Sequence, residues 1–164
     1  MIKTAVKLFF TIILGLTFVC RASANDTTVL HAGVSLNSQV PTELMGSWRV
    51  VSKLETSNAA GTFKPLGVDI WNLFKTNNVI TLSNPLSGAK ASVDVEFVKN
   101  NTVKFSKSGN YDDQKLTDTV EITLSGDTFV GKNYLLLTSP NGGEKKATYA
   151  LKGNKISGGN LTED

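Results

Sequence analysis

The chain has 164 residues, of which 40% are hydrophobic and 19% charged, and its formal net charge is +3. This length and composition are typical of one globular domain with a substantial apolar core. The positive excess comes from residues 1–24, which hold three of the 17 basic residues and no acidic residue. Residues 25–164 therefore carry 14 basic and 14 acidic side chains, and this balance argues against nucleic acid as a partner.

Residues 1–24 have the pattern of a secretory signal peptide. Two lysines precede an apolar run over residues 8–19, and Ala-Ser-Ala at 22–24 has the small residues of a cleavage site. The apolar run is too short to span a membrane. We therefore expect export to a periplasm or to the outside of the cell, without stable membrane insertion of the mature chain. Residues 25–43 would then form a leader before the folded domain.

The single cysteine and the single histidine both precede the predicted domain. Cys20 lies in the predicted signal peptide, and His31 lies in the leader. Because neither a thiol nor an imidazole follows, the sequence predicts no disulfide, no metal centre and no cofactor. Nucleophilic catalysis of the Ser/His or Cys/His kind is excluded for the same reason, so we expect no enzyme and no catalytic residue.

From residue 46 onward, apolar and polar residues alternate in short runs that Gly, Asn, Asp and Pro interrupt. This alternation predicts strands with one buried face, joined by hairpin turns. In the clearest run, 91–98, we expect Val93, Val95 and Phe97 to share the apolar face. The predicted strands occupy residues 46–55, 79–82, 91–98, 103–106, 116–124, 128–139, 147–152 and 155–157.

About eight strands with one apolar face each, and no amphipathic helix to cover them, predict an all-β fold. An open sheet of this size would leave two unpaired edges and an uncovered apolar face. We therefore predict an antiparallel up-and-down barrel over residues 44–164. Residues 62–74 fit either a short helix that caps the barrel or an irregular second strand, and strand or loop is favoured. Outside, Lys104 or Lys107 is expected to pair with Asp94 or Glu96.

Three segments resemble the lipocalin-like proteins of the calycin superfamily, in particular small bacterial members: residues 46–48 (Gly-Ser-Trp), 61–67 and 125–128. In that family a tryptophan plugs the closed end of the barrel, and a basic side chain of the last strand lies across it. The resemblance implies that Trp48 is the plug. It gives the basic role to Lys152 or Lys155, where the family more often has arginine.

The alternation also predicts which side chains face the interior, where a small ligand would bind. The expected ligand-binding residues are Val95, Phe97, Phe105, Asp118, Val120, Ile122, Tyr134 and Tyr149. Trp71 and Phe74 are further aromatic candidates. Asp118 is the one acid on an apolar face. It either lies near a strand end in water or orients the polar end of a ligand beside Tyr149 or Tyr134.

Two functions fit this pattern. One is a secreted carrier that holds a small apolar molecule inside the barrel. The other is a packed barrel whose loops bind another macromolecule, as an inhibitor, an adhesion module or an envelope component. The interior volume separates them, because a carrier needs a continuous pocket of several hundred cubic ångströms, whereas a sealed interior favours the second function.

Overall fold

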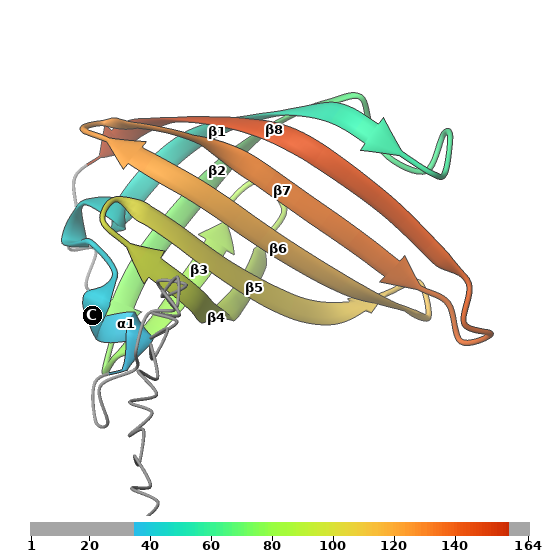
Figure 1. Cartoon of the computed structure of the whole chain (residues 1–164), viewed down its shortest axis with the longest axis horizontal. Coiled ribbons are helices and arrows are strands. Elements are labelled where there is room, and N and C mark those ends of the chain that lie inside the picture. The colour runs from blue at the N-terminus through green and yellow to red at the C-terminus, as the bar shows by residue number, and fades with distance from the viewer. Residues whose placement is uncertain (1–34, 158–164) are drawn as a thin grey trace, which may run out of the picture.

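The computed structural model describes residues 35–157 (Figure 1). The predicted signal peptide with Cys20, and the part of the leader that contains His31, lie outside this range. Within it, eight antiparallel strands close into a barrel in which each strand pairs with the next and β8 pairs with β1, so the predicted up-and-down barrel is confirmed. The strands are β1 (Gly46–Ser57), β2 (Leu66–Thr76), β3 (Val79–Asn84), β4 (Ala89–Lys99), β5 (Thr102–Tyr111), β6 (Gln114–Ser125), β7 (Thr128–Thr138) and β8 (Glu144–Ser157).

The strand bounds settle one ambiguity of the sequence and correct one prediction. The segment 62–74 leads into β2, so the strand interpretation is confirmed and the capping helix is excluded. The two short pieces predicted at the chain's end are one strand, β8. Gly153 keeps this strand continuous because it lies where any side chain would overlap the ring of Phe129.

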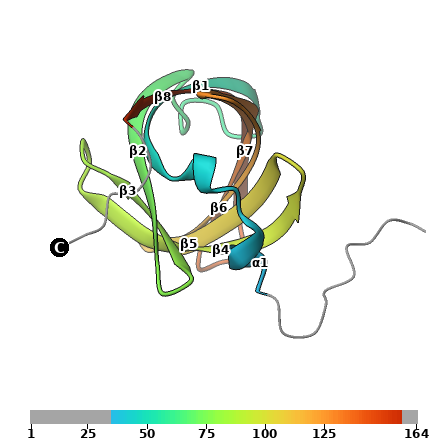
Figure 2. The same ribbon diagram turned by 90° about the vertical axis from the view of Figure 1, so that its left-hand side faces the viewer.

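The two ends of the barrel differ in their connections. One end carries the β2–β3, β4–β5 and β6–β7 hairpins together with a short helix, α1 (Leu36–Gln39), and a turn of 3₁₀ helix, η1 (Thr42–Leu44). Figure 2 looks along the barrel and shows η1, in cyan, across the space that the strands enclose. The opposite end carries the four remaining hairpins and, among residues 35–157, no helix. We call these the closed end and the open end.

Trp48 seals the closed end from within. Its side chain is fully buried, and its Nε1 donates a hydrogen bond of 2.9 Å to the carbonyl oxygen of Leu44 in η1. The Phe129 ring lies 5.1 Å from the Trp48 ring, centroid to centroid. The Nζ of Lys155 lies 5.3 Å from the centroid of Trp48 and donates a hydrogen bond of 2.7 Å to the carbonyl oxygen of Glu43. The two hydrogen bonds therefore hold η1 against the barrel, while the cation–π contact joins β8 to β1 across the tryptophan.

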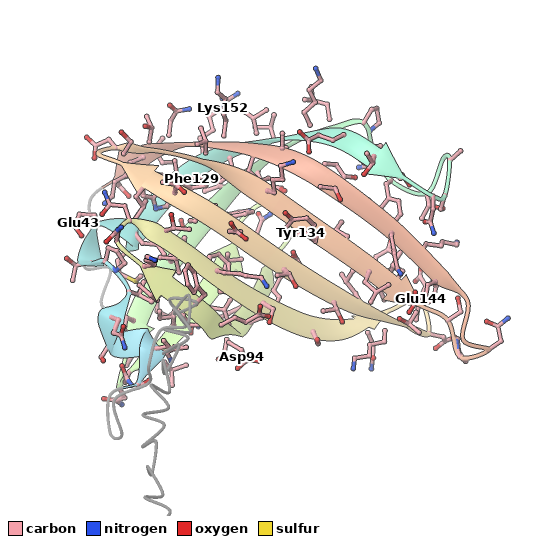
Figure 3. The ribbon with its side chains drawn as sticks, in the orientation of Figure 1. Glu43, Asp94, Phe129, Tyr134, Glu144 and Lys152 are labelled. Carbon is pink, nitrogen blue, oxygen red and sulfur yellow. The ribbon has the colours of Figure 1, made fainter. Side chains whose placement is uncertain are left out.

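Lys152 does not take part in this plug, which corrects its assignment. Its register partners are Val51 on β1 and Val130 on β7, and all three lie on the outer face. Figure 3 shows the Lys152 side chain pointing away from the barrel. The resemblance left the role open between Lys152 and Lys155. Lys155 lies on the same inward face of β8 as Tyr149, and its side chain lies across Trp48.

A β-bulge in β4 changes which residues face inward. Val95 pairs with Phe105, but the next pair joins Phe97 to Lys104, so one extra residue lies on β4. Lys104 is on the outer face, where its Nζ lies 2.9 Å from Glu96 Oε2. The prediction that Phe97 shares the inner face of Val95 is therefore wrong.

The outer-face pair between Glu96 and Lys104 was one of the alternatives that the sequence offered, and it is confirmed. The hydrogen bond from Lys104 lowers the pKa of the Glu96 carboxyl, with a smaller effect from Ser106. Both side chains are more than a third exposed, so the pair adds little stability.

Within residues 35–157, no helix has the length and apolarity needed to cross a membrane.

Candidate functional site

A cavity of about 480 Å³ occupies the half of the barrel next to the open end. Its floor, nearest the closed end, is apolar and consists of Val50, Trp71, Leu82 and Leu151. Around the middle of the wall runs a set of polar side chains that we call the interior belt: Ser52, Asp69, Asn84, Lys107, Asp118 and Asn133. Nearer the mouth the wall has the apolar or aromatic residues Phe63, Leu116, Leu135, Leu137 and Tyr149, together with the polar residues Thr62, Lys64, Ser87 and Lys90.

The β5, β6 and β7 strands place a neutralised carboxylate in the belt. Lys107 pairs with Asp118 in the β5–β6 register, and Lys107 Nζ lies 3.3 Å from Asp118 Oδ2. Asn133 Nδ2 donates to the other oxygen, Asp118 Oδ1, and also to the carbonyl oxygen of Thr119 at 3.2 Å. The Asp118 side chain is only 16% exposed. Asp118 therefore faces inward and has both a cation and an amide as partners, which is how a half-buried carboxylate is stabilised.

The β2 and β3 strands place a second carboxylate in the belt. Asn84 Nδ2 donates a hydrogen bond of 2.9 Å to Asp69 Oδ1. Because β2 and β6 lie four strands apart in a closed order of eight, Asp69 and Asp118 lie on opposite walls. The belt thus has an acid–amide pair on each side, and within the described part of the chain only the Asp118 pair includes a lysine among its contacts.

Tyr149 connects the wall to the β1–β2 loop at the mouth. Its hydroxyl donates a hydrogen bond of 3.0 Å to the carbonyl oxygen of Lys64. Burial raises the pKa of the Tyr149 phenol above its ordinary value. The adjacent Phe63 also lines the cavity and packs against the core. The hydrogen bond from the Tyr149 hydroxyl therefore fixes the β1–β2 loop beside the entrance of the cavity.

We predict that Tyr149→Phe lowers the free energy of unfolding by about 1 kcal/mol at neutral pH, because one hydrogen bond is lost. A raised folded-state pKa means that the stabilisation is present below the ordinary tyrosine pKa and is lost as the pH rises through the raised value. The difference between variant and parent should therefore shrink in alkali. Denaturant titrations over a range of pH check this, with Tyr134→Phe on the outer face as the control.

The structure brings only part of the predicted ligand-binding set to the cavity. Asp118 and Tyr149 line it, as does Trp71. Four more of the predicted residues point into the barrel but pack in the apolar core instead of lining the cavity: Val95, Phe105, Val120 and Ile122. The sequence therefore predicted which side chains of these strands face the interior of the barrel. It did not predict where along the barrel the packed core ends and the cavity begins.

Two further aromatic candidates lie outside, in addition to Phe97. Tyr134 pairs with Thr119 on the outer face and is 40% exposed (Figure 3). Phe74 follows the inward Leu73 and so faces outward, with Lys90 Nζ 5.2 Å from its ring centroid. The expectation that Tyr134 and Phe74 line the interior is wrong, because the strand parity is set by buried neighbours such as Leu73.

Sequence reasoning missed four belt residues: Asp69, Asn84, Lys107 and Asn133. The signal for Lys107 was its parity with Val103 and Phe105, which places it inward, although it was interpreted as an outer-face partner. The corresponding signal for Asp69 was its parity with Trp71. Among residues 35–157, no group of three or more His, Cys, Asp or Glu side chains could hold a metal ion.

Comparison of the chain with protein-family models, with curated proteins and with solved structures finds no match. The closed eight-stranded antiparallel barrel is compatible with a lipocalin-like fold. The chemistry that this arrangement offers is an apolar chamber with oriented polar groups at mid-height.

Proposed function

We propose that this protein is an exported, non-enzymatic, lipocalin-like barrel that holds one small, largely apolar molecule in its open half. The observation that carries the proposal is the 480 Å³ cavity beneath the open end. This volume lies within the range of about 300 to 1,000 Å³ that ligand sites occupy. The proposal of export rests on the signal-peptide pattern of residues 1–24.

The contrast between the two halves of the barrel supports this function. The closed half is filled by large side chains, of which Trp48, Phe129 and Leu73 are buried to 1% exposure or less. The open half has inward leucines and one tryptophan on its wall, yet these side chains leave space. A wall that is mostly apolar with a few oriented polar groups is typical of small-molecule sites. A barrel that acted only through its loops would have no need of this space.

We predict that Leu135→Trp weakens the binding of an apolar molecule. Leu135 lines the cavity, and a tryptophan there would take up part of its volume. Nile red, a neutral fluorescent dye, should bind the parent protein with a blue-shifted emission and bind the variant at least about tenfold more weakly, a loss of about 1.4 kcal/mol. Fluorescence titration measures both affinities.

Leu136→Trp is the matched control. Leu136 neighbours Leu135 on β7 but pairs with Thr117 on the outer face, so the same substitution there leaves the cavity open. Its Nile red affinity should equal that of the parent. Equal binding by all three proteins would place the dye elsewhere and contradict the proposed function, as would the absence of binding to the parent.

A further inference from the structure

The two inward carboxylates of the belt differ in one respect. Asp118 has Lys107 at 3.3 Å and the amide of Asn133. Asp69 has the amide of Asn84, and the structure gives it no ion pair within residues 35–157. Two other lysines line the cavity, and neither forms an ion pair with Asp69: Lys90 lies over the outward Phe74 ring, and Lys64 is an exposed residue of the mouth loop.

The amide that holds Asp69 is itself fixed. Asn84 Oδ1 accepts hydrogen bonds from the backbone N–H groups of Leu86 at 2.9 Å and Ser87 at 3.3 Å. Rotating the amide by half a turn would place its NH₂ group against these two donors. Asn84 Nδ2 must therefore point at Asp69, and the β3–β4 turn holds the carboxylate in one orientation before any ligand arrives.

The inward neighbours of Asp69 on β2 line the same cavity as the carboxylate. The inward residues of this strand are Gly67 toward the mouth, then Asp69, then Trp71 toward the floor. Gly67 has no side chain of its own, and the Oγ of Ser52 occupies the space beside it, 2.6 Å from where a Cβ would lie. Trp71 also lines the cavity, with its ring stacked on that of Phe129 at 6.1 Å between centroids, and a cation is attracted to an aromatic ring. A carboxylate and an aromatic ring on the wall of one cavity are suitable partners for an ammonium group.

We propose that the ligand is an amphipathic amine whose protonated nitrogen binds Asp69 while its apolar part fills the cavity. The inference rests on the proposed function and names the chemical class of the ligand. A half-buried carboxylate without a counter-charge is unfavourable, and an ammonium donor relieves this with a charge-assisted hydrogen bond. The ammonium group of the ligand thus gives Asp69 the positively charged partner that Lys107 gives Asp118.

The test uses three probes of equal chain length: octylamine, octanol and octanoate. Calorimetric titration at neutral pH should show that octylamine binds about tenfold or more tightly than octanol, as one charge-assisted hydrogen bond predicts. Octanoate should bind most weakly, because Asp69 repels it. In Asp69→Asn, which keeps the shape of the side chain, the preference for the amine should disappear while octanol binds as before.

Asp94→Asn is the matched control. Asp94 is an exposed acid on the outer face of β4 (Figure 3), so its removal changes the net charge equally and should leave the preference for octylamine intact. Octanol binding with no preference for the amine, tightest binding of octanoate, or an amine preference that persists in Asp69→Asn would each overturn the inference and leave the proposed function standing. Failure of all three probes to bind would overturn the proposed function itself.

Discussion

Trp48→Ala is expected to lower the free energy of unfolding by about 3 to 5 kcal/mol, a large part of the stability of a domain of this size. The tryptophan is fully buried, contacts the Phe129 ring and holds η1 through its hydrogen bond to Leu44. Its removal leaves a void at the closed end, and Lys155 loses the ring that it covers. Urea denaturation measures the loss.

Trp71→Ala is the matched control, because the chain has two tryptophans and each variant keeps the other as its fluorescent reporter. Trp71 is half-buried and lines a space that is already open, so its removal should cost less stability but weaken the binding of Nile red. A larger stability loss in Trp71→Ala than in Trp48→Ala would show that the barrel is not sealed as described.

Gly131→Ala is expected to be nearly as damaging, with a loss of about 3 kcal/mol, at the upper end of what overpacking costs. A Cβ at Gly131 would overlap the carbonyl oxygen of Glu121 and lie 2.8 Å from Ile122 Cα. Both are backbone atoms of the neighbouring strand β6, which cannot move aside as a flexible side chain could. Replacing glycine by alanine within a strand ordinarily stabilises the protein, because glycine weakens a strand. The loss of stability expected here is therefore opposite in sign to this intrinsic preference.

Gly109→Ala provides the comparison for this prediction. Gly109 also lies within a strand, β5, but a Cβ there meets no atom within 4 Å. This variant should be as stable as the parent or slightly more stable, because alanine restricts the unfolded chain. Thermal unfolding of both variants checks the pair, and similar midpoints would show that β6 and β7 do not approach as closely at Gly131 as the structure indicates.

The barrel was predictable from the sequence because each strand carries its own periodic signal. In β6, for example, Val120, Ile122 and Leu124 alternate with polar residues, and all three are buried. Turn chemistry marked the hairpins as well: Asn77 and Asn78 both adopt positive φ, as a two-residue turn requires. Closure followed from the absence of helices that could cover an open sheet.

The orientation of Phe97 was not predictable in the same way. The run around it alternates without a break, so nothing in the sequence marks the extra residue that the bulge places on β4. The bulge arises from pairing, because it lets Val98 join Val103 in the core and keeps Glu96 beside Lys104 outside. Strand parity is reliable only as long as the register with the neighbour is regular.

The interior belt could not be predicted from the sequence for a different reason. Lys107 has the inward parity of Phe105, but a lysine among polar residues is ordinarily placed in solvent. Its inward orientation makes sense only once Asp118 is found beside it on β6. The same holds for Asn133, which takes the inward place on β7 that had been given to Tyr134. Polar residues inside a barrel are identified by their partners, and partners come from the register.

Mass spectrometry under non-denaturing conditions, on protein purified from its own source, tests most directly whether the open half of the barrel holds a small molecule. We predict that the chain carries one added small mass, which is released on unfolding and is absent from Leu135→Trp but present in Leu136→Trp. A parent protein that has only the mass of its own chain, under conditions in which Nile red also fails to bind, would contradict it.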